Sequence, residues 1–236
     1  MIVLLLAALI FLGIHFLVSG TPLRNAVART IGESPYLGLF SLLSLIGIAW
    51  LAVSYNAAEA SSENAILYDL GIGSRHAAIP VIALAFFLGA QGLFVKNPTA
   101  VQGETLAGKA IAIEGVLRIT RHPFLWGVAI WSAFHLAANG DIASVIFFGT
   151  FFVLAVLGTF SIDAKRRRKM GAAWQAFAAK TSNLPFAAIA SGRNRLNGSE
   201  LFGWRFWAAA ALFLVMLFAH ARLFRASPFP TGWVPF

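Results

Sequence analysis

Six long apolar segments are the feature that most restricts how this chain can fold. Crossing the hydrocarbon core of a bilayer, about 30 Å thick, takes roughly 20 helical residues. Segments of about that length predict an all-α fold, a polytopic membrane bundle of about six transmembrane helices in one domain over residues 1–236. The expected spans are 2–19, 36–54, 76–95, 123–139, 142–162 and 204–223.

Composition supports a membrane protein and excludes some chemistry. Apolar residues make up 59% of the chain and charged residues 11%, whereas a soluble domain averages about 45–50% and about 25%. The absence of cysteine excludes disulfides, iron–sulfur clusters and thiolate ligands. The net charge of +9 lies mostly in loops beside apolar segments, where it contacts lipid headgroups. We therefore expect membrane lipid as a partner and no nucleic acid.

The distribution of basic residues predicts the orientation of the bundle. Fifteen of the 18 Lys and Arg residues follow the first, third and fifth spans. The positive-inside rule then places both termini outside the cytoplasm. The first span lacks the basic flank of a cleaved signal peptide, so we expect it to be permanent.

The connections between spans carry two further predictions. Gly140 and Asp141 predict a tight turn that makes a helical hairpin of the fourth and fifth spans. Residues 163–179 predict a basic cytoplasmic interfacial helix with Trp174 and Phe177 on one side, suited to the lipid surface. The run 165–169 is expected to face lipid as well.

The fourth span holds a polar stripe. Ser132, His135 and Asn139 share one helical face, with Trp131 beside them. Lipid offers no hydrogen-bond partners, so this stripe should face the interior of the bundle. His122 precedes His135 by 13 residues and points roughly the other way, so we do not expect the two to bind one ion together.

Two more histidines lie inside spans. His15 is in the first span and His220 in the sixth, and an imidazole in hydrocarbon is costly without a partner. Neutral imidazole is a common axial ligand of haem iron, so the three histidines predict a cofactor site. At about 1.5 Å per residue, His15 and His135 differ in level by roughly 8 Å, and His220 lies closer to the level of His135. Either can pair with His135, and all three can instead be interhelical hydrogen-bond donors.

Several motifs resemble one family. The stretch 114–123 (EGVLRITRHP) with Trp131 and His135 is similar to the NnrU family, which includes the plant 15-cis-zeta-carotene isomerases. Further similarity lies in the segments Gly32–Glu33 with Tyr36 and Phe40, Thr181–Ser182, 185–189, Gly192–Arg193 and 218–220. Together these segments cover nearly the whole chain.

The resemblance implies either of two roles. One is a multi-pass protein of the bacterial inner membrane that acts in nitrogen-oxide metabolism (denitrification), with periplasmic termini and a possible membrane redox partner. The other is a polyene isomerase with a lipophilic substrate. The isomerase branch carries haem b on two histidines, which correspond to His15 and His135 as metal ligands. Trp131, Ser132 and Asn139 would orient those ligands. Ser132 stands where the plant family has a cysteine, which excludes a thiolate ligand switch.

A second resemblance competes with the first. Arg121-His122-Pro123 followed by Gly127 also resembles the motif of isoprenylcysteine and phospholipid methyltransferases. It implies an S-adenosylmethionine site at the cytoplasmic mouth, with Arg121 and His122 as polar contacts and Asp163 across the site. Asp163 stands where that pattern has two adjacent acids. A third possibility is a cofactor-free membrane assembly or regulatory partner, and whether the chain is an enzyme stays open.

Overall fold

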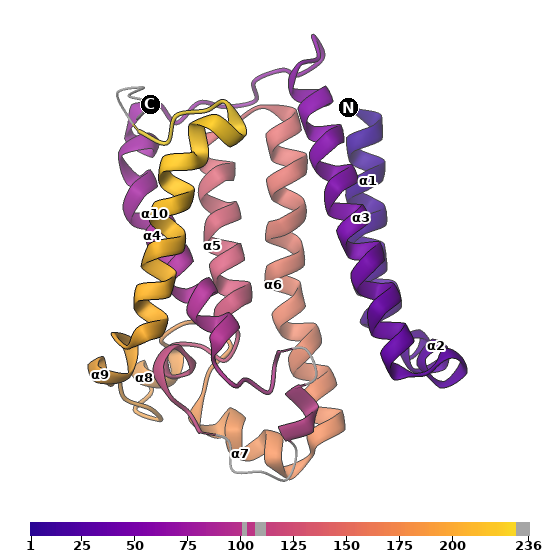
Figure 1. Ribbon diagram of the computed structural model, residues 1–236, viewed down its shortest axis with the longest axis vertical. Coiled ribbons are helices and arrows are strands. Elements are labelled where there is room, and N and C mark those ends of the chain that lie inside the picture. Colours follow the sequence, from indigo (N-terminus) through magenta and orange to yellow (C-terminus); the bar gives the residue numbers. More distant parts are fainter. Residues whose placement is uncertain (101–102, 107–111, 230–236) are drawn as a thin grey trace. The chain divides into compact units, whose positions relative to one another are not determined.

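In the part of the chain that the structure describes, every named element of secondary structure is a helix. The computed structural model describes residues 1–100, 103–106 and 112–229 (Figure 1). The α-helices in these ranges are α1 (Ile2–Gly13), α2 (Leu23–Ile31), α3 (Glu33–Glu59), α4 (Ile72–Phe94), α5 (Pro123–Ala138), α6 (Ile142–Met170), α7 (Ala172–Lys180), α8 (Ala187–Ala190), α9 (Gly198–Leu201) and α10 (Trp204–Phe224). A π-helix, η1 (Ile14–Ser19), continues α1, and two short 3-10 helices, η2 (Gly103–Leu106) and η3 (Gly115–Arg118), lie between α4 and α5.

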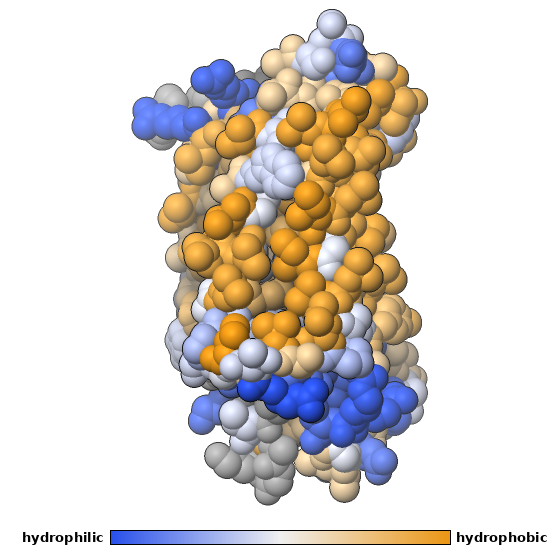
Figure 2. All heavy atoms as spheres, turned by 90° about the vertical axis from the view of Figure 1, so that its right-hand side faces the viewer, coloured by the Kyte–Doolittle hydropathy of each residue, from blue (hydrophilic) through white to orange (hydrophobic). Residues whose placement is uncertain are grey.

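Five helical segments of the described residues are long and apolar enough to cross a membrane. The prediction of an all-α membrane bundle is therefore confirmed, and the remaining expected span is the shorter apolar helix α5. Figure 2 shows apolar side chains spread along the helices of one face, with hydrophilic side chains gathered beyond their ends. The five segments are Ile2–Ser19, Glu33–Glu59, His76–Phe94, Ile142–Met170 and Trp204–Phe224.

The chain divides into two compact units. Unit 1 consists of Met1–Leu70 and His135–Leu154, and unit 2 of Gly71–Phe134 and Ala155–Phe236. The chain passes between the units three times: before α4, inside α5 and inside α6. That the whole of 1–236 behaves as a single domain stays a prediction.

Unit 1 is built on the packing of α1 against α3. Small residues let the two backbones approach, since a Cβ added to Gly47 would lie 2.8 Å from the Phe11 ring. The Phe11 ring also lies 5.9 Å from the Phe151 ring of α6. The buried core of this unit consists of Leu4, Ala7, Ala8, Phe11, Leu51, Ala58 and Ala143.

The turn expected at Gly140–Asp141 is present and is covered by the loop after α3. The Gly140 carbonyl accepts a hydrogen bond of 2.7 Å from the backbone N–H of Leu67. Asn64 donates a 3.0 Å hydrogen bond to the Asp141 carboxylate, and Tyr68 donates one to the carbonyl of Leu136. These bonds satisfy polar groups of the turn that would otherwise lack partners.

In unit 2, glycines bring α4 and α5 into close contact. A Cβ on Gly127 would lie 2.6 Å from the Cα of Gly89, and a Cβ on Gly92 would lie 2.7 Å from the backbone N of Phe124. The other face of α4 packs on α10, where the Phe86 and Phe213 rings lie 5.8 Å apart. The glycine four residues after Pro123 in the sequence motif therefore serves close helix packing.

The expected interfacial helix over 163–179 is wrong in two respects. Its first half continues α6 to Met170, and α7 begins only after Gly171, whose φ of 53° favours glycine and ends the helix. Trp174 and Phe177 pack with Met170 in a buried cluster instead of facing lipid. Arg166, expected to face lipid, is buried and donates a 2.7 Å hydrogen bond to the Ala100 carbonyl.

Substitution of Gly140 by alanine should destabilise the protein, because the added Cβ would lie 1.8 Å from the backbone oxygen of Tyr68. Overpacking of this kind costs about 1–3 kcal/mol. Gly149→Ala is the matched control, since no atom lies within 4 Å of its added Cβ. Thermal unfolding in detergent should show a lower melting temperature for Gly140→Ala and an equal or higher one for the control. Equal melting temperatures for wild type and Gly140→Ala would contradict the packing of this turn.

Candidate functional site

A buried polar cluster in unit 2 is centred on the Asp163 carboxylate of α6. Arg121 donates to it from Nε at 2.9 Å and from Nη2 at 2.5 Å. His122 Nε2 lies 2.7 Å from Oδ1, and Asn183 Nδ2 donates to Oδ2 at 3.2 Å. Charge-assisted bonds of this type are among the strongest in proteins. Arg121, His122, Asp163 and Asn183 are called the Asp163 cluster below.

Backbone hydrogen bonds hold the segments that carry these side chains. Thr120 donates to the carbonyl of Asn183 at 2.6 Å, and Trp126 Nε1 donates to the same carbonyl at 2.8 Å. The Arg121 N–H donates to the Ser182 carbonyl at 2.9 Å. Pro123 begins α5, so Arg121 and His122 lie in the short connection between η3 and this helix. These contacts to the segment around Asn183 therefore fix their position.

A third segment closes the Asp163 cluster from the loop after α4. The carbonyl of Arg121 accepts hydrogen bonds from Asn97 Nδ2 at 3.0 Å and from Thr99 Oγ1 at 2.7 Å. The Arg121 guanidinium also lies 5.5 Å from the centre of the Trp174 ring, within cation–π range. The cluster thus joins α6, α7 and three loop segments of unit 2.

Burial favours the neutral form of His122, whose Nε2–H donates to the Asp163 carboxylate. Its side chain is 1% exposed, and this burial lowers its pKa, although the Asp163 carboxylate opposes the shift. When Nε2–H donates to Asp163, Nδ1 keeps a lone pair, and this atom is buried with no hydrogen-bond partner in the structure. Asn183 Oδ1 is also buried without a hydrogen-bond partner in the structure. Two such acceptors can receive hydrogen bonds from a small donor such as a water molecule.

The structure brings together the three residues expected at the cytoplasmic mouth, namely Arg121, His122 and Asp163. A shallow, open pocket of about 430 Å³ lies beside them, with Phe160 and Leu184 among its apolar residues. Arg121 lines this pocket, but its Nε and Nη2 donate to Asp163 and its Nη1 donates to the Thr181 carbonyl at 3.4 Å. Binding of S-adenosylmethionine at this place stays a prediction.

In unit 1, His15 lies at the start of the π-helix η1. Its Nδ1 lies 2.8 Å from the Phe11 carbonyl, and its ring lies 4.5 Å from the Phe11 ring and 5.2 Å from the Phe40 ring. A carbonyl can only accept, so Nδ1 carries the hydrogen and Nε2 keeps a lone pair. Short π-helical turns inside α-helices occur frequently at functional sites. A histidine oriented in this way by a carbonyl is suited to bind a metal through Nε2.

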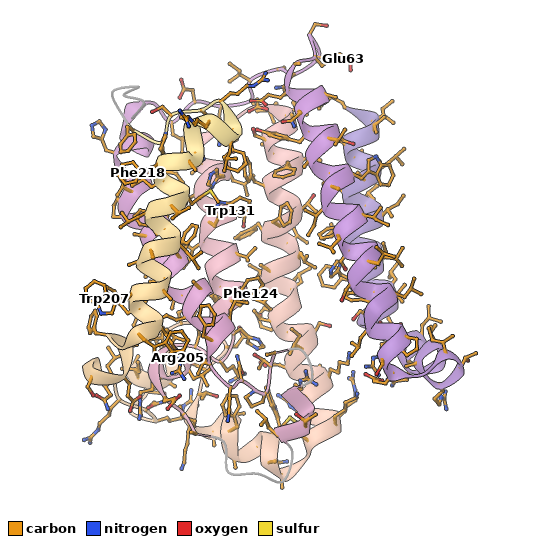
Figure 3. All side chains as sticks on the ribbon, viewed as in Figure 1. Glu63, Phe124, Trp131, Arg205, Trp207 and Phe218 are labelled. Carbon is orange, nitrogen blue, oxygen red and sulfur yellow. The ribbon has the colours of Figure 1, made fainter. Side chains whose placement is uncertain are left out.

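His135 also belongs to unit 1, where its ring stacks on Phe148 at 4.6 Å. The other polar residues expected around it bond to backbone groups of their own helix. Asn139 Nδ2 donates to the His135 carbonyl at 3.0 Å, and Ser132 donates to the Val128 carbonyl at 2.7 Å. Trp131 lies on α5 beyond Phe124 (Figure 3). The proposed role of Trp131, Ser132 and Asn139 around a cofactor stays a prediction.

His220 lies in unit 2, on α10. Its Nδ1 lies 2.8 Å from the Ala226 carbonyl, and its ring packs on Phe224 at 4.9 Å. His15 and His135 therefore share one unit, whereas His220 belongs to the other. Among the described residues, no group of three or more His, Cys, Asp or Glu side chains is arranged to hold a metal ion.

Sequence reasoning missed a second buried charge, near the start of α3. Arg24 of α2 is 6% exposed and forms an ion pair with Glu33. Its guanidinium lies 5.0 Å from the centre of the Tyr36 ring. The sequence signal was present in Gly32–Glu33 and Tyr36, which only the family resemblance singled out. Arg24, Glu33 and Tyr36 are called the Arg24 cluster below.

Comparison with known proteins identifies the family. The family model described as NnrU protein matches residues 3–228. The chain belongs to the NnrU family. This confirms the resemblance drawn from the motifs, among them the segment that bears His135.

Two curated plant relatives match this NnrU-family chain, and both are named 15-cis-zeta-carotene isomerase, chloroplastic. The protein of Zea mays is 28% identical and that of Arabidopsis thaliana 26%, each over 98% of this chain. The chain spans 63% of the length of these relatives. No solved structure matches the chain with significance. Location in a bacterial inner membrane and periplasmic termini stay predictions, since both relatives are chloroplast proteins.

Asp163→Asn should strongly destabilise the protein, because it leaves the buried Arg121 guanidinium without a counter-charge. Breaking a buried ion pair in this way costs about 3–5 kcal/mol. Glu200→Gln is the matched control, since Glu200 pairs with Arg118 at 2.7 Å but both side chains are about a quarter exposed; its cost should be about 1 kcal/mol or less. Chemical unfolding in detergent measures both. Equal losses in the two variants would contradict the structural role of the Asp163 cluster.

His122 should make the stability of the protein depend on pH. The unfolded chain takes up the histidine proton near pH 6.5, whereas burial lowers the pKa of His122 in the folded protein. The contribution of this histidine is therefore complete above about pH 6.5 and is lost as the pH falls below that value. His122→Gln should reduce the slope of unfolding free energy against pH by up to about 1.4 kcal/mol per pH unit. An unchanged slope in His122→Gln would show that His122 is protonated equally in both states.

Proposed function

We propose that this NnrU-family protein isomerises a cis double bond in a long conjugated hydrocarbon within the membrane. The observation that carries the proposal is its similarity to the two plant isomerases over 98% of the chain. Similarity of this extent covers every described helix, and is not confined to a short motif. The proposal concerns the part of the plant proteins that this chain matches, which is 63% of their length.

We further propose haem b as the cofactor, with His15 and His135 as its ligands. The residues present fit this group. The His15 Nδ1–H is used by the Phe11 carbonyl, which leaves Nε2 with the lone pair that a haem iron binds. His135 lies in the same unit, and the chain has no cysteine to compete as a ligand. When bound, haem b would supply an iron centre able to exchange an electron with a conjugated substrate.

Aromatic side chains of the protein surround both proposed ligands. Phe11 and Phe40 flank the His15 ring, and Phe148 covers one face of the His135 ring. These rings exclude water from the imidazoles and restrict their rotation. Apolar surroundings of this kind also suit a hydrocarbon substrate, which gains its binding energy from burial and not from hydrogen bonds.

The three other functions expected from the sequence remain predictions. Action in denitrification, with a membrane redox partner, and a cofactor-free role are predictions from the resemblance and from the packing of the histidines. A methyltransferase depends on the Asp163 cluster, in which the donors of Arg121 and His122 already serve Asp163. The test below separates these possibilities, because only a haem-dependent isomerase gives both a haem spectrum and an altered polyene.

Purified protein should give the pyridine haemochrome spectrum of haem b. His15→Ala and His135→Ala should each lower the haem content by about tenfold or more, since each removes a ligand. His76→Ala is the control, because His76 is exposed at the start of α4. Protein in liposomes loaded with 15-cis-zeta-carotene should shift the isomer ratio seen by chromatography. A wild-type protein without a haem band would end the cofactor proposal. A haem-loaded protein that leaves the carotene unchanged would end the isomerase proposal.

A further inference from the structure

The Arg24 cluster places a guanidinium in a buried position that its ion pair does not explain. Arg24 has a side chain that is 7% exposed, whereas the side chain of its partner Glu33 is 52% exposed. A solvated carboxylate compensates a buried charge poorly, because the desolvation cost falls on the arginine while water weakens the attraction. A surface ion pair would be equally well formed with both groups in water. Its other acceptor, Asn25 Oδ1 at 3.5 Å, also belongs to an exposed residue. The position of Arg24 therefore suits a further, buried acceptor on its inner side.

Tyr36 supplies an independent sign of a missing acceptor. Tyr36 is 4% exposed, and its hydroxyl is buried with no hydrogen-bond partner. Buried hydroxyl groups nearly always have a partner, and an unpaired one costs about 1–3 kcal/mol. The guanidinium of Arg24 lies over the ring of this same tyrosine, 5.0 Å from its centre. A buried hydroxyl without an acceptor thus lies beside a buried guanidinium whose acceptors belong to exposed residues.

A row of aromatic rings connects these donors to His15. The Tyr36 and Phe40 rings stack at 6.2 Å, one turn apart on α3. The Phe40 ring meets His15 edge-on at 5.2 Å. All of these residues belong to unit 1. The Arg24 cluster therefore lies along the same face as the histidine whose Nε2 is oriented for a metal.

We propose that Arg24 and the Tyr36 hydroxyl bind the propionate carboxylates of the haem held at His15, an inference that rests on the cofactor proposed above. The chemistry of the donors selects the ligand. A conjugated hydrocarbon has no hydrogen-bond acceptor, so it gives no reason to bury a guanidinium or a phenol. Haem b has both features that unit 1 is suited to bind: an iron for the imidazole and two carboxylates for the donors. Arginine binds carboxylates through paired N–H groups.

Glu33 has a defined role in this arrangement. Its half-exposed carboxylate neutralises Arg24 before the cofactor arrives and can turn to solvent when a propionate takes its place. This exchange replaces a solvated acceptor with a buried one, which strengthens the interaction. Glu33→Gln should therefore bind haem at least as tightly as wild type.

The test compares two porphyrins that differ only in their carboxylates. Apo-protein is titrated in detergent with haemin and with haemin dimethyl ester, and the Soret band gives each dissociation constant. Wild type should bind haemin about tenfold more tightly or better, as expected for a bond to a charged group. Arg24→Gln combined with Tyr36→Phe should retain the Soret band and lose the preference. Arg29→Gln on the exposed side of α2 and Tyr55→Phe, whose hydroxyl bonds Ser144 at 3.1 Å, are the controls and should keep it.

Tyr36→Phe alone protects the test against a folding defect. It removes a hydroxyl that has no partner in the protein, so the free energy of unfolding of the apo-protein should not fall, while the preference for haemin should. A wild type without a Soret band for either porphyrin would overturn the cofactor proposal itself. A wild type that binds both porphyrins equally, or a double variant that keeps the preference, would overturn only the role of Arg24 and Tyr36.

Discussion

The hydrogen bonds to the Asp163 carboxylate are the interaction on which the loop end of unit 2 depends. The segments around Asn97, Arg121 and Asn183 have no long helix or sheet to hold them. They are joined because each contributes a donor or a carbonyl to one network around a buried acid. The glycine contacts between α4 and α5 make this network possible, since they bring the end of α4 beside Pro123. A buried polar network thus lies beside the apolar cluster of Met170, Trp174 and Phe177 at this end of the unit.

In unit 1, local hydrogen bonds satisfy the polar groups at the helix ends. Its loop after α3 covers the Gly140–Asp141 turn with backbone and Asn64 hydrogen bonds, so the ends of α5 and α6 are satisfied without a buried ion pair. Its histidines likewise use nearby groups: His15 bonds a carbonyl one turn earlier, and His135 stacks on Phe148. The Arg24 cluster is the exception, because the buried Tyr36 hydroxyl has no acceptor in the structure and the acceptors of Arg24 belong to exposed residues.

Some of these features can be predicted from the sequence and others cannot. Apolar block length fixes the helices that cross the membrane, and their ends are shifted only where strong helix formers follow the apolar block. The run after Asp163 is rich in Lys and Arg, which favour helix, so α6 continues to Met170 until Gly171 stops it. Periodicity cannot decide whether the Trp174 face meets lipid or protein, because both are apolar. The pairing of Arg24 with Glu33 depends on the turn between α2 and α3, which no local pattern specifies.

His122 and His15 each have a ring oriented by a hydrogen bond, but the two differ in burial. In His122 the carboxylate of Asp163 fixes Nε2, and the remaining nitrogen is sealed within the protein. In His15 a carbonyl fixes Nδ1, and the side chain is only partly buried among aromatic rings. The His15 ring is therefore more accessible than the His122 ring, as the proposed binding of a flat macrocycle at His15 requires. The partner also affects the bond to iron, since a neutral carbonyl withdraws the Nδ1 proton less than a carboxylate does. An iron bound to His15 would therefore have a less electron-rich ligand than one bound to a carboxylate-paired histidine.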